Sequence, residues 1–257
     1  MIKTYSDKHG QKFTRIYQII LADLLVAPEY KIAPRGIPIH EFVNASIEVD
    51  SDNVVINFLE TGCPERQEVY DRYRREELAW YLSGSVIASS APSKFWLKLA
   101  DGEGKITSNY GHMMMHDKIY PKNKGWVGLR DMTALEKVVD TLAKDPDSRQ
   151  AVVHYNQPKH CYEGNKDFPC TMYSQFFIRD NKLHISTHQR SVDVIKGLSY
   201  DICWSSHFLE IVLGELQITM PTLALGKVSM IFGSMHLYEK DIGLAMKITK
   251  DTYGPDK

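Results

Sequence analysis

Apolar residues recur at helical spacing along several stretches of the chain. Phe13, Ile16, Tyr17, Ile20 and Leu24 return every three or four positions, which predicts an amphipathic helix over residues 11–27, ending before Pro28. The same pattern predicts helices over 65–82, 132–142, 240–250 and from Tyr200 onward, with a short helix at Trp96. In the helix after Tyr200 the expected core stripe is Phe208, Leu209, Val212, Leu213 and Leu216.

Alternation of apolar and polar residues marks the strands between these helices. It predicts strands at residues 40–49, 54–59, 151–155, 172–178, 182–189 and 228–232. Asp180 and Asn181 separate two of these strands, and both residue types tolerate the dihedral angles of a tight turn. Residues 172–189 are therefore predicted to form a β-hairpin. By contrast, Ala33-Pro34-Arg35-Gly36 and the segment around Tyr110 are typical of loops.

The predicted hairpin places a cysteine near an arginine. If the turn centres on Asp180 and Asn181, Cys170 lies opposite Ser191 or its neighbour, and cross-strand Cβ atoms are about 5 Å apart. A guanidinium at that distance favours the thiolate and lowers the pKa of Cys170. A one-residue shift in register turns the cysteine to the opposite face, and the sequence alone leaves both registers open.

Composition sets limits on the type of protein. The chain has 257 residues, 43% of them hydrophobic and 25% charged, which fits one large globular domain or two small ones. A formal net charge of -1 predicts no general polyanion-binding surface. Four cysteines without CxxC spacing, and no recognisable signal peptide, predict reduced thiols in a cytoplasmic protein. No apolar run approaches the ~20 residues of a membrane span.

Several short motifs in this order have a known counterpart. Pro169-Cys170 is followed one hairpin later by Gln189-Arg190-Ser191, then by Asp193 and Gly197. These residues resemble those of the thymidylate synthases, and the resemblance extends over most of the chain. It implies an α+β fold in a single domain over residues 1–257, with a central mixed β-sheet flanked by helices. One face of that sheet is expected to form a homodimer.

The resemblance assigns roles to individual residues. The expected catalytic residues are Cys170 as nucleophile, Glu77 for active-site water and proton transfer, Tyr110 near the pyrimidine, and Asp201 at the base. The expected nucleotide-binding residues are Arg35, Arg149, Gln189, Arg190, Ser191, Asp193, His236 and Tyr238. The expected folate-binding residues are Trp80, Trp96, Asp193 and Gly197, and no metal is expected.

Some of these matches have simpler explanations. Glu77 is distinguished from a surface glutamate only by its Glu-Leu-Ala-Trp context, and Tyr110 could be a packing aromatic. Arg35 could be a solvated loop residue, because the glycine pattern around it is altered. His236 and Tyr238 could be packing residues at a strand end. In the Asp-Pro-Asp-Ser-Arg-Arg motif of the family, Arg149 is expected to reach the partner's phosphate, whereas Gln150 replaces the second arginine.

Asp201 occupies a position where thymidylate synthases have asparagine. An asparagine amide complements the N–H and carbonyl of uracil, whereas a carboxylate accepts a hydrogen bond from the amino group of cytosine. A proton on the carboxyl or on the ring nitrogen completes a second bond. The residue therefore predicts a cytidylate substrate. The alternative for Asp201 is a helix N-cap, a position that aspartate favours.

Asp201, together with Pro-Cys-Thr in place of Pro-Cys-His, makes the chain look most like the deoxycytidylate hydroxymethylase branch of the family, known from phages. That branch implies one-carbon transfer from 5,10-methylenetetrahydrofolate to carbon 5 of dCMP, with water as the final nucleophile, in the cytoplasm of the host. The polar end of the chain, residues 251–257, favours water because it is a poor hydrophobic lid. This activity serves nucleotide biosynthesis and DNA modification.

Other functions stay open at this level. Within the family they are a dCMP 5-methyltransferase, a CMP hydroxymethylase and a thymidylate synthase acting on dUMP. Outside it, Cys170 could be a buried structural thiol in a nucleotide-binding module. A cysteine hydrolase is a further class, and it requires a histidine beside the thiol.

Overall fold

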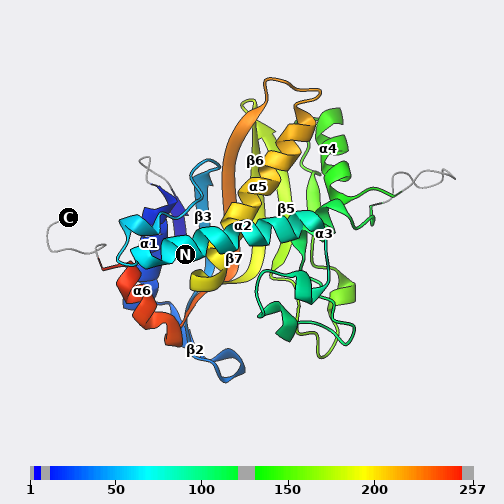
Figure 1. The fold of residues 1–257 in the computed structure, drawn as a ribbon. Coiled ribbons are helices and arrows are strands. Elements are labelled where there is room, and N and C mark those ends of the chain that lie inside the picture. Colours follow the sequence, from blue (N-terminus) through cyan, green and yellow to red (C-terminus); the bar gives the residue numbers. More distant parts are fainter. Residues whose placement is uncertain (1–2, 7–11, 121–130, 251–257) are drawn as a thin grey trace. The chain divides into compact units, whose positions relative to one another are not determined.

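The computed structural model describes residues 3–6, 12–120 and 131–250 (Figure 1). The chain divides into two compact units. Unit 1 comprises Met1–Arg72, Ser186–Phe208 and Gly226–Lys257, and unit 2 comprises Tyr73–Ile185 and Leu209–Leu225. The single-domain organisation therefore stays a prediction. The polar end expected to favour water, residues 251–257, lies outside the described residues.

Unit 1 contains a mixed sheet. Its strand order is β1-β3-β7-β6, with β2 paired to β3. β1 is parallel to β3, whereas β2 and β7 are antiparallel to it. These strands are β1 (Lys3–Ser6), β2 (Tyr30–Ile32), β3 (Ile39–Asp50), β6 (Lys182–Asp193) and β7 (Ala224–Tyr238); the first residues of β6 and β7 belong to unit 2. The strands predicted at residues 40–49 and 228–232 are confirmed, and the second is longer than expected.

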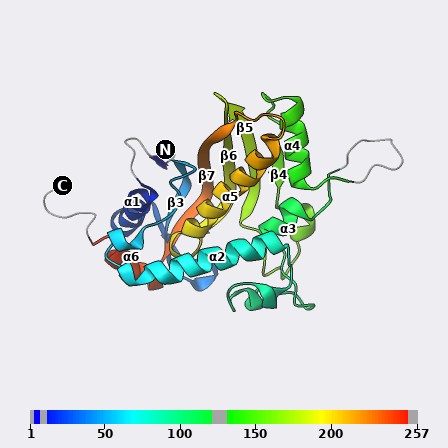
Figure 2. The same cartoon turned by 45° about the horizontal axis from the view of Figure 1, so that its top comes forward.

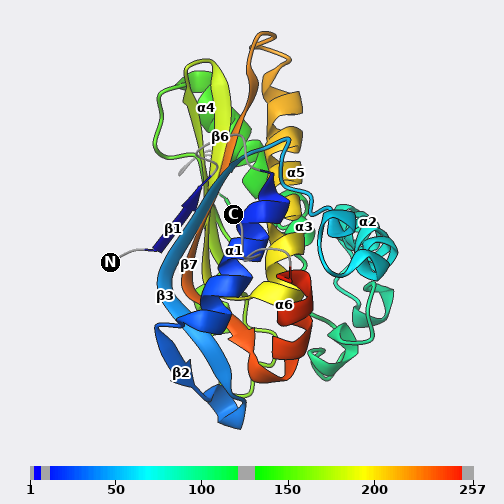
Figure 3. The ribbon, with the colours of Figure 1, turned by 90° about the vertical axis from the view of Figure 1, so that its left-hand side faces the viewer.

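The helices α1 (Phe13–Val26) and α6 (Ile242–Ile248) pack together in unit 1, and α1 also covers β3 (Figure 3). The apolar stripe predicted for the first helix is buried: Phe13, Ile16, Tyr17, Ile20 and Leu24 are at most 2% exposed. A helical periodicity read from the sequence thus identified the face that packs on the sheet.

Unit 2 has its own sheet strands and helices. β4 (Val152–His154) pairs antiparallel with β5 (Thr171–Arg179), and β5 is followed in strand order by β6. α4 (Ala134–Lys144) packs on β4 and on α3 (Tyr110–Met115), as Figure 2 shows. A capping box between Thr133 and Glu136 starts α4, so the predicted helix at 132–142 is confirmed with its start two residues later.

Two long helices contribute residues to both units: α2 (Gln67–Ser83) and α5 (Ser199–Leu216). Both were predicted from the sequence. The stripe expected on α5 is buried, with Leu209, Val212 and Leu216 fully inaccessible. Among the helices of the described residues, none is long and apolar enough to span a membrane.

The β5–β6 hairpin has the predicted two-residue turn. Asp180 and Asn181 have φ angles of 52° and 55°, both left-handed, as a type I′ turn requires. The Asn181 amide also donates to the Thr222 carbonyl at 2.7 Å, which holds the turn within unit 2. This turn chemistry was readable from the sequence because Asp and Asn tolerate left-handed φ better than most residues.

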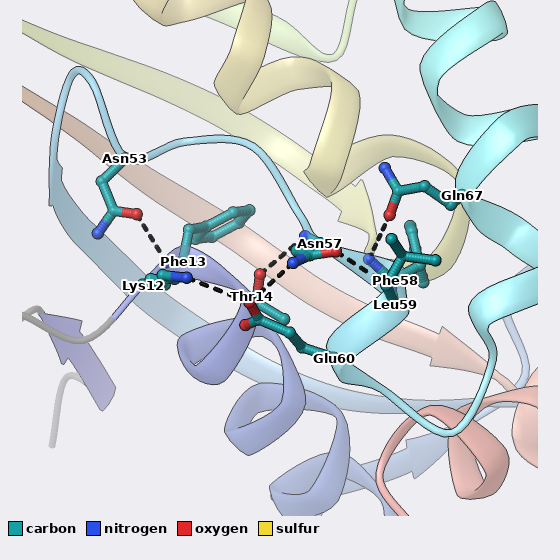
Figure 4. Close-up of polar contacts among 9 residues, drawn as sticks. All are labelled: Lys12, Phe13, Thr14, Asn53, Asn57, Phe58, Leu59, Glu60 and Gln67. Carbon is teal, nitrogen blue, oxygen red and sulfur yellow. Dashed lines mark hydrogen bonds and ion pairs between the residues drawn. The ribbon is translucent and has the colours of Figure 1, made fainter.

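The strand predicted at residues 54–59 is wrong. This segment ends in a 3₁₀ turn, Phe58–Glu60, and its backbone donors bond to side chains instead of a neighbouring strand. Asn57 N–H donates to Thr14 Oγ1 at 2.8 Å, and Phe58 N–H donates to Gln67 Oε1 at 2.6 Å (Figure 4). Because the partners come from α1 and α2, tertiary contacts override the local alternation.

Two short strands and one short helix were not predicted. β1 and β2 have four and three residues, and every residue of β2 is exposed, so neither carries a clear alternation. Tyr110, expected in a loop, is the first residue of α3. Its helix has only six residues, too few to show a helical period.

Candidate active site

Cys170 lies immediately before β5 and is half-buried. Its backbone N–H and that of Thr171 both donate to the Tyr110 hydroxyl oxygen, each at 3.1 Å. One phenol therefore fixes the backbone on both sides of the sulfur-bearing residue. The tyrosine is itself 6% exposed, with its ring edge-on to Tyr155 at 5.4 Å. Tyr110 and Cys170, which were both expected at the pyrimidine, are therefore neighbours in unit 2.

Close packing of α3 on α2 sets the position of Tyr110. A Cβ added at Gly111 would lie 2.0 Å from the Tyr81 carbonyl oxygen, so only glycine permits this approach. Asn109 caps α3 by accepting from His112 N–H at 2.7 Å, and its amide donates to the Ser85 carbonyl at 2.9 Å. The Asn-Tyr-Gly sequence therefore has a structural reason at each position.

Asp167 connects the cysteine segment to the segment before Tyr110. Its carboxylate accepts from the N–H groups of Thr107 and Ser108 at 2.6 and 2.8 Å, and from the Ser108 hydroxyl at 2.5 Å. Burial raises the pKa of Asp167, and these three donors oppose the shift. Sequence reasoning missed this residue, because its partners are about 60 positions away in the chain.

Glu77 lies on α2 and is 8% exposed, which is unusual for a glutamate on a charged helix. Its carboxylate accepts from the Tyr73 hydroxyl at 3.1 Å, one turn earlier. Trp80 follows Glu77 by three residues and so lies on the same side of the helix. The surface explanation for Glu77 is therefore wrong, because the side chain is buried.

Trp80 and Trp96 form an aromatic pair in unit 2. Their rings are 5.0 Å apart with an interplanar angle of 46°. Both indole Nε1 atoms are buried, and neither has an acceptor among the described residues. A buried donor without a partner costs free energy, which a ligand carrying acceptor atoms can recover. Trp80 and Trp96 are therefore candidate contacts for a ligand that carries acceptor atoms.

Asp201 accepts a hydrogen bond from Gln189 in unit 1. Gln189 Nε2 lies 3.0 Å from Asp201 Oδ2. Burial raises the pKa of Asp201 to about 6, the negative charge of Asp193 adds to the shift, and the Gln189 bond opposes it. A Cβ at Gly197 would lie 3.3 Å from the same Oδ2, so this glycine leaves room beside the carboxylate.

Helix capping does not explain Asp201. The residue lies inside α5, and its carboxylate faces the Gln189 side chain. The capping residue is Asp193, whose Oδ1 accepts from the N–H groups of Ile195 and Lys196 at 2.9 and 3.1 Å, at the start of a π-helical turn before α5. Burial raises the pKa of Asp193 as well. The capping alternative for Asp201 is therefore wrong.

Positive charges collect around His236 in unit 1. Burial lowers the pKa of His236 to about 4, and the charges of Arg190 and Arg35 lower it further. Arg35 has a left-handed φ of 54° within the turn Pro34–Gly36, a conformation that non-glycine residues adopt at a cost. Arg190 also donates to Ser191 Oγ at 3.2 Å. Two guanidinium groups near one imidazole are suited to binding an anion.

Tyr238 and Lys196 border this positive cluster. The Tyr238 ring lies edge-on to His236, with centroids 5.1 Å apart, so both residues belong to one face of β7. Lys196 Nζ is 5.8 Å from the Tyr238 ring centroid and 3.1 Å from Asp241 Oδ2. Lys196 was not identified from the sequence, because an exposed lysine carries no distinguishing pattern.

Arg149 is exposed, in the turn between α4 and β4 of unit 2. Its carbonyl accepts from the Gln175 amide at 2.8 Å, and Gln150 N–H donates to Ser148 Oγ at 3.2 Å. These contacts hold the backbone of the turn. Its expected contact with the phosphate in a partner subunit stays a prediction.

The predicted site residues are divided between the two units. Unit 2 holds Cys170, Tyr110, Glu77, Trp80, Trp96 and Arg149; unit 1 holds Arg35, Gln189, Arg190, Ser191, Asp193, Gly197, Asp201, His236 and Tyr238. The expected proximity of Cys170 to the Arg190 guanidinium stays a prediction, as do the individual roles of these residues. No cluster of three or more potential metal ligands occurs within residues 3–6, 12–120 and 131–250.

Comparison with known proteins places these features in one family. The family model described as thymidylate synthase matches residues 53–255. The chain is similar to the deoxycytidylate 5-hydroxymethyltransferase of Enterobacteria phage T6, with 32% identity over 179 residues, which cover 66% of this chain and 68% of the relative. It is 31% identical, over the same shares, to the deoxycytidylate 5-hydroxymethyltransferases of phages T4 and T2. The chain therefore belongs to the thymidylate synthase family, whose members transfer a one-carbon unit to a pyrimidine nucleotide.

Proposed function

We propose that this protein is a deoxycytidylate 5-hydroxymethyltransferase. Its substrate is dCMP, its one-carbon donor is 5,10-methylenetetrahydrofolate, and its product is 5-hydroxymethyl-dCMP. The observation that carries the proposal is the partly buried Asp201 carboxyl, bonded to Gln189, at the position where the family usually has an amide. The similarity to three phage deoxycytidylate 5-hydroxymethyltransferases supports it.

Cys170 supplies the nucleophile in this proposal. A pyrimidine is a poor carbon nucleophile, and covalent addition replaces one difficult step by two easier ones. The Cys170 sulfur forms a bond to ring carbon 6, and the electrons of the carbon 5–carbon 6 double bond move toward carbon 5. Tyr110 holds the backbone N–H groups of Cys170 and Thr171, so the sulfur starts from one fixed position.

Asp201 selects the base. Its carboxyl accepts from the exocyclic amino group of cytosine, because Gln189 occupies only one of the acceptor sites on Oδ2. With a pKa of about 6, protonation of the Asp201 carboxyl costs little free energy at neutral pH. The protonated carboxyl donates a hydrogen bond to ring nitrogen 3. Uracil presents an N–H at position 3 and a carbonyl at position 4, so a carboxylate opposite it leaves acceptor facing acceptor.

The positive cluster of unit 1 anchors the phosphate. Arg35 and Arg190 both act electrostatically on His236, and a guanidinium offers paired donors to phosphate oxygens. Ser191 adds a hydroxyl beside Arg190. We further propose that the enzyme works as a homodimer through one sheet face, with Arg149 reaching the phosphate in the partner subunit. This part rests on the family resemblance.

Trp80 and Trp96 hold the folate. When bound, methylenetetrahydrofolate supplies the one-carbon unit that carbon 5 receives. The two indoles provide aromatic surface, and their unpartnered N–H groups provide donors for the acceptor atoms of the folate ring. Asp193 and Gly197 are the further residues assigned to this ligand. The assignment of Asp193 and Gly197 to the folate rests on the family resemblance.

Water completes the reaction in this proposal. After carbon 5 has lost its proton to a base and tetrahydrofolate has left, the exocyclic methylene on carbon 5 takes hydroxide from water. Cleavage of the sulfur–carbon 6 bond then restores the ring double bond and returns the thiolate of Cys170. Glu77 is suited to hold and deprotonate that water, because it is a buried carboxylate that already accepts a hydrogen bond from the Tyr73 hydroxyl. A hydride in place of the hydroxide would give a methyl product.

One incubation tests the proposal. The protein is mixed with methylenetetrahydrofolate and an equal mixture of dCMP, CMP and dUMP, and the nucleotides are then analysed by mass spectrometry. We expect a single new species, dCMP carrying a hydroxymethyl group. Its mass exceeds that of the methyl product by one oxygen atom, so base, sugar and product are identified together.

Each other outcome selects a different function. Thymidylate from dUMP identifies a thymidylate synthase, and 5-methyl-dCMP identifies a methyltransferase. Hydroxymethyl-CMP identifies an enzyme that acts on the ribonucleotide. Nucleotide binding with no product from any substrate contradicts the proposal and supports a binding module. The matched control is Cys170→Ser, which removes the nucleophile and should bind dCMP without turnover.

A further inference from the structure

A chain of three polar side chains links β3 to β7 in unit 1. The paired strands place Glu41 directly opposite His236, and Ser234 lies two residues before His236 on the same side of β7. Glu41 is 8% exposed and His236 is 9% exposed. Glu41 lies near the start of β3, and a carboxylate buried this deeply needs hydrogen-bond donors.

Ser234 is the middle member of the chain. Its hydroxyl donates to Glu41 Oε1, and its Oγ lies 3.4 Å from His236 Nδ1. A serine hydroxyl has a single proton, whereas an ionised carboxylate can only accept. Because that proton is directed to Glu41, the serine oxygen faces His236 as an acceptor. His236 must then carry a proton on Nδ1 to complete the hydrogen bond.

The imidazole stays neutral in this arrangement. Burial lowers the pKa of His236 to about 4, and Arg190 and Arg35 act in the same direction. A neutral imidazole with a proton on Nδ1 has a lone pair on Nε2. Among the described residues, the hydrogen-bond partner of the His236 ring is Ser234, at Nδ1, which leaves Nε2 for a ligand. The Tyr238 ring, edge-on at 5.1 Å and 89°, borders the imidazole.

We propose that Glu41 and Ser234 are positioning residues that fix His236 as the Nδ1–H tautomer, so that Nε2 accepts a hydrogen bond from a ligand hydroxyl. The ligand assignment rests on the proposed function and on the resemblance to the thymidylate synthases, in which the histidine and tyrosine at these positions bind the 3′-hydroxyl of the nucleotide sugar; that hydroxyl would act as the donor. The tautomer itself follows from Glu41, Ser234 and His236 alone.

The direction of this hydrogen bond has a chemical consequence. An acceptor at Nε2 favours a sugar that offers an O–H, and it gains nothing from a substituent that only accepts. A nucleotide with fluorine in place of the 3′-hydroxyl is close in size but has no proton to donate. We expect it to bind about tenfold more weakly than dCMP, the effect of one lost hydrogen bond. The opposite tautomer would tolerate the fluorine.

The direct test is nitrogen-15 NMR of the histidine side chains in the ligand-free protein. The His236 signal is assigned by comparison with His236→Gln. We expect a neutral ring with the proton on Nδ1. Ser234→Ala should allow both tautomers, and Glu41→Gln should disturb the preference, because an amide can donate to Ser234 and reverse its proton. Ser234→Thr keeps the hydroxyl and should keep the tautomer.

The chain supplies a matched control on the same two strands. Ser229 on β7 donates to Glu48 on β3 at 3.3 Å, and the strand register pairs these two residues directly. No histidine is bonded to this serine among the described residues. Ser229→Ala removes the same kind of contact from the same sheet and should leave the His236 signal unchanged. A wild-type spectrum with the proton on Nε2 overturns the inference. So does a Ser234→Ala spectrum identical to that of the wild type.

Failure of the inference and failure of the proposed function are separable. The NMR experiment needs no nucleotide, so it judges the tautomer even if dCMP is not a substrate. With an active enzyme, Ser234→Ala should raise the KM for dCMP about tenfold with a smaller change in kcat. It should also abolish the discrimination against the 3′-fluoro nucleotide. Retained discrimination in Ser234→Ala contradicts the role of Ser234.

Discussion

The Asp201→Asn substitution removes an ionisable group whose pKa is raised to about 6 by burial. A carboxyl with a raised pKa in the folded state contributes stability that is fully present below its unfolded-state pKa and is lost as the pH rises through the folded value. The difference from the ordinary value of 3.8 is about 2 units, which corresponds to a ceiling of about 3 kcal/mol. Between about pH 7.5 and about pH 5 the expected gain is about 1.4 kcal/mol.

This gain is measured as a difference between two proteins. Urea unfolding of the wild type and Asp201→Asn at both pH values gives four free energies of unfolding. Groups that do not interact with Asp201 titrate alike in both proteins and cancel; Asp193 interacts with it, and the double variant with Asp193→Asn separates its contribution. We expect the wild type to gain about 1.4 kcal/mol more than the variant when the pH is lowered. Asp52→Asn, at an exposed turn residue of unit 1, is the matched control and should show no such difference.

An equal pH response in the wild type and Asp201→Asn would refute the reasoning. It would mean that solvent or another group relieves the burial of the carboxyl, so that the protonated form is not favoured. The donor role proposed for Asp201 toward cytosine would then lose its electrostatic basis. A loss of stability in the variant at every pH, with an unchanged pH response, would point to the Gln189 bond alone.

Three further outcomes are expected. Tyr110→Phe leaves two backbone N–H groups without their acceptor, so stability should fall by about 1–3 kcal/mol and kcat should fall more than substrate affinity; an unchanged kcat measured at saturation would contradict the anchoring role. Gly111→Ala should lower the thermal midpoint, because the new methyl group would lie 2.0 Å from the Tyr81 carbonyl oxygen, whereas Gly243→Ala, where nothing lies within 4 Å, should not. Cys170→Ser should bind dCMP in calorimetry but form no product, and a near-normal rate would exclude covalent catalysis.

Local patterns in the sequence were sufficient for much of the fold. The helix at α1 and the stripe on α5 follow from apolar spacing, because burial on one face imposes that spacing. The β5–β6 hairpin follows from Asp180 and Asn181, which allow its left-handed turn. In these cases the physical cause lies within a few residues of the element, so the sequence records it.

Contacts between distant segments could not be read from the sequence. The wrongly predicted strand at 54–59 has an alternating pattern, yet its backbone donors bond to Thr14 and Gln67. Asp167 reaches Ser108 across 59 positions, and Glu41 reaches Ser234 across 193. These polar pairs form only when distant segments meet in the fold, so no periodic pattern of the local sequence predicts them.

In the candidate site, too, local motifs were predictable from the sequence and contacts between distant residues were not. Motifs identified Cys170, Tyr110 and Asp201, and the structure then replaced the capping explanation of Asp201 with a hydrogen bond from Gln189. Helix capping was the alternative explanation of Asp201. The sequence could not exclude it, because Asp193 and Asp201 both precede apolar runs and only the folded backbone shows that the Asp193 oxygen accepts from the N–H groups.

The central claim is that an acidic side chain selects cytosine for attack by a cysteine sulfur. The most direct measurement is the ratio of kcat/KM for dCMP to kcat/KM for dUMP, in the wild type and in Asp201→Asn. We expect the ratio to favour dCMP in the wild type and to fall by at least about 100-fold in the variant, because an amide complements uracil. An unchanged ratio would show that another residue reads the base and would contradict the account.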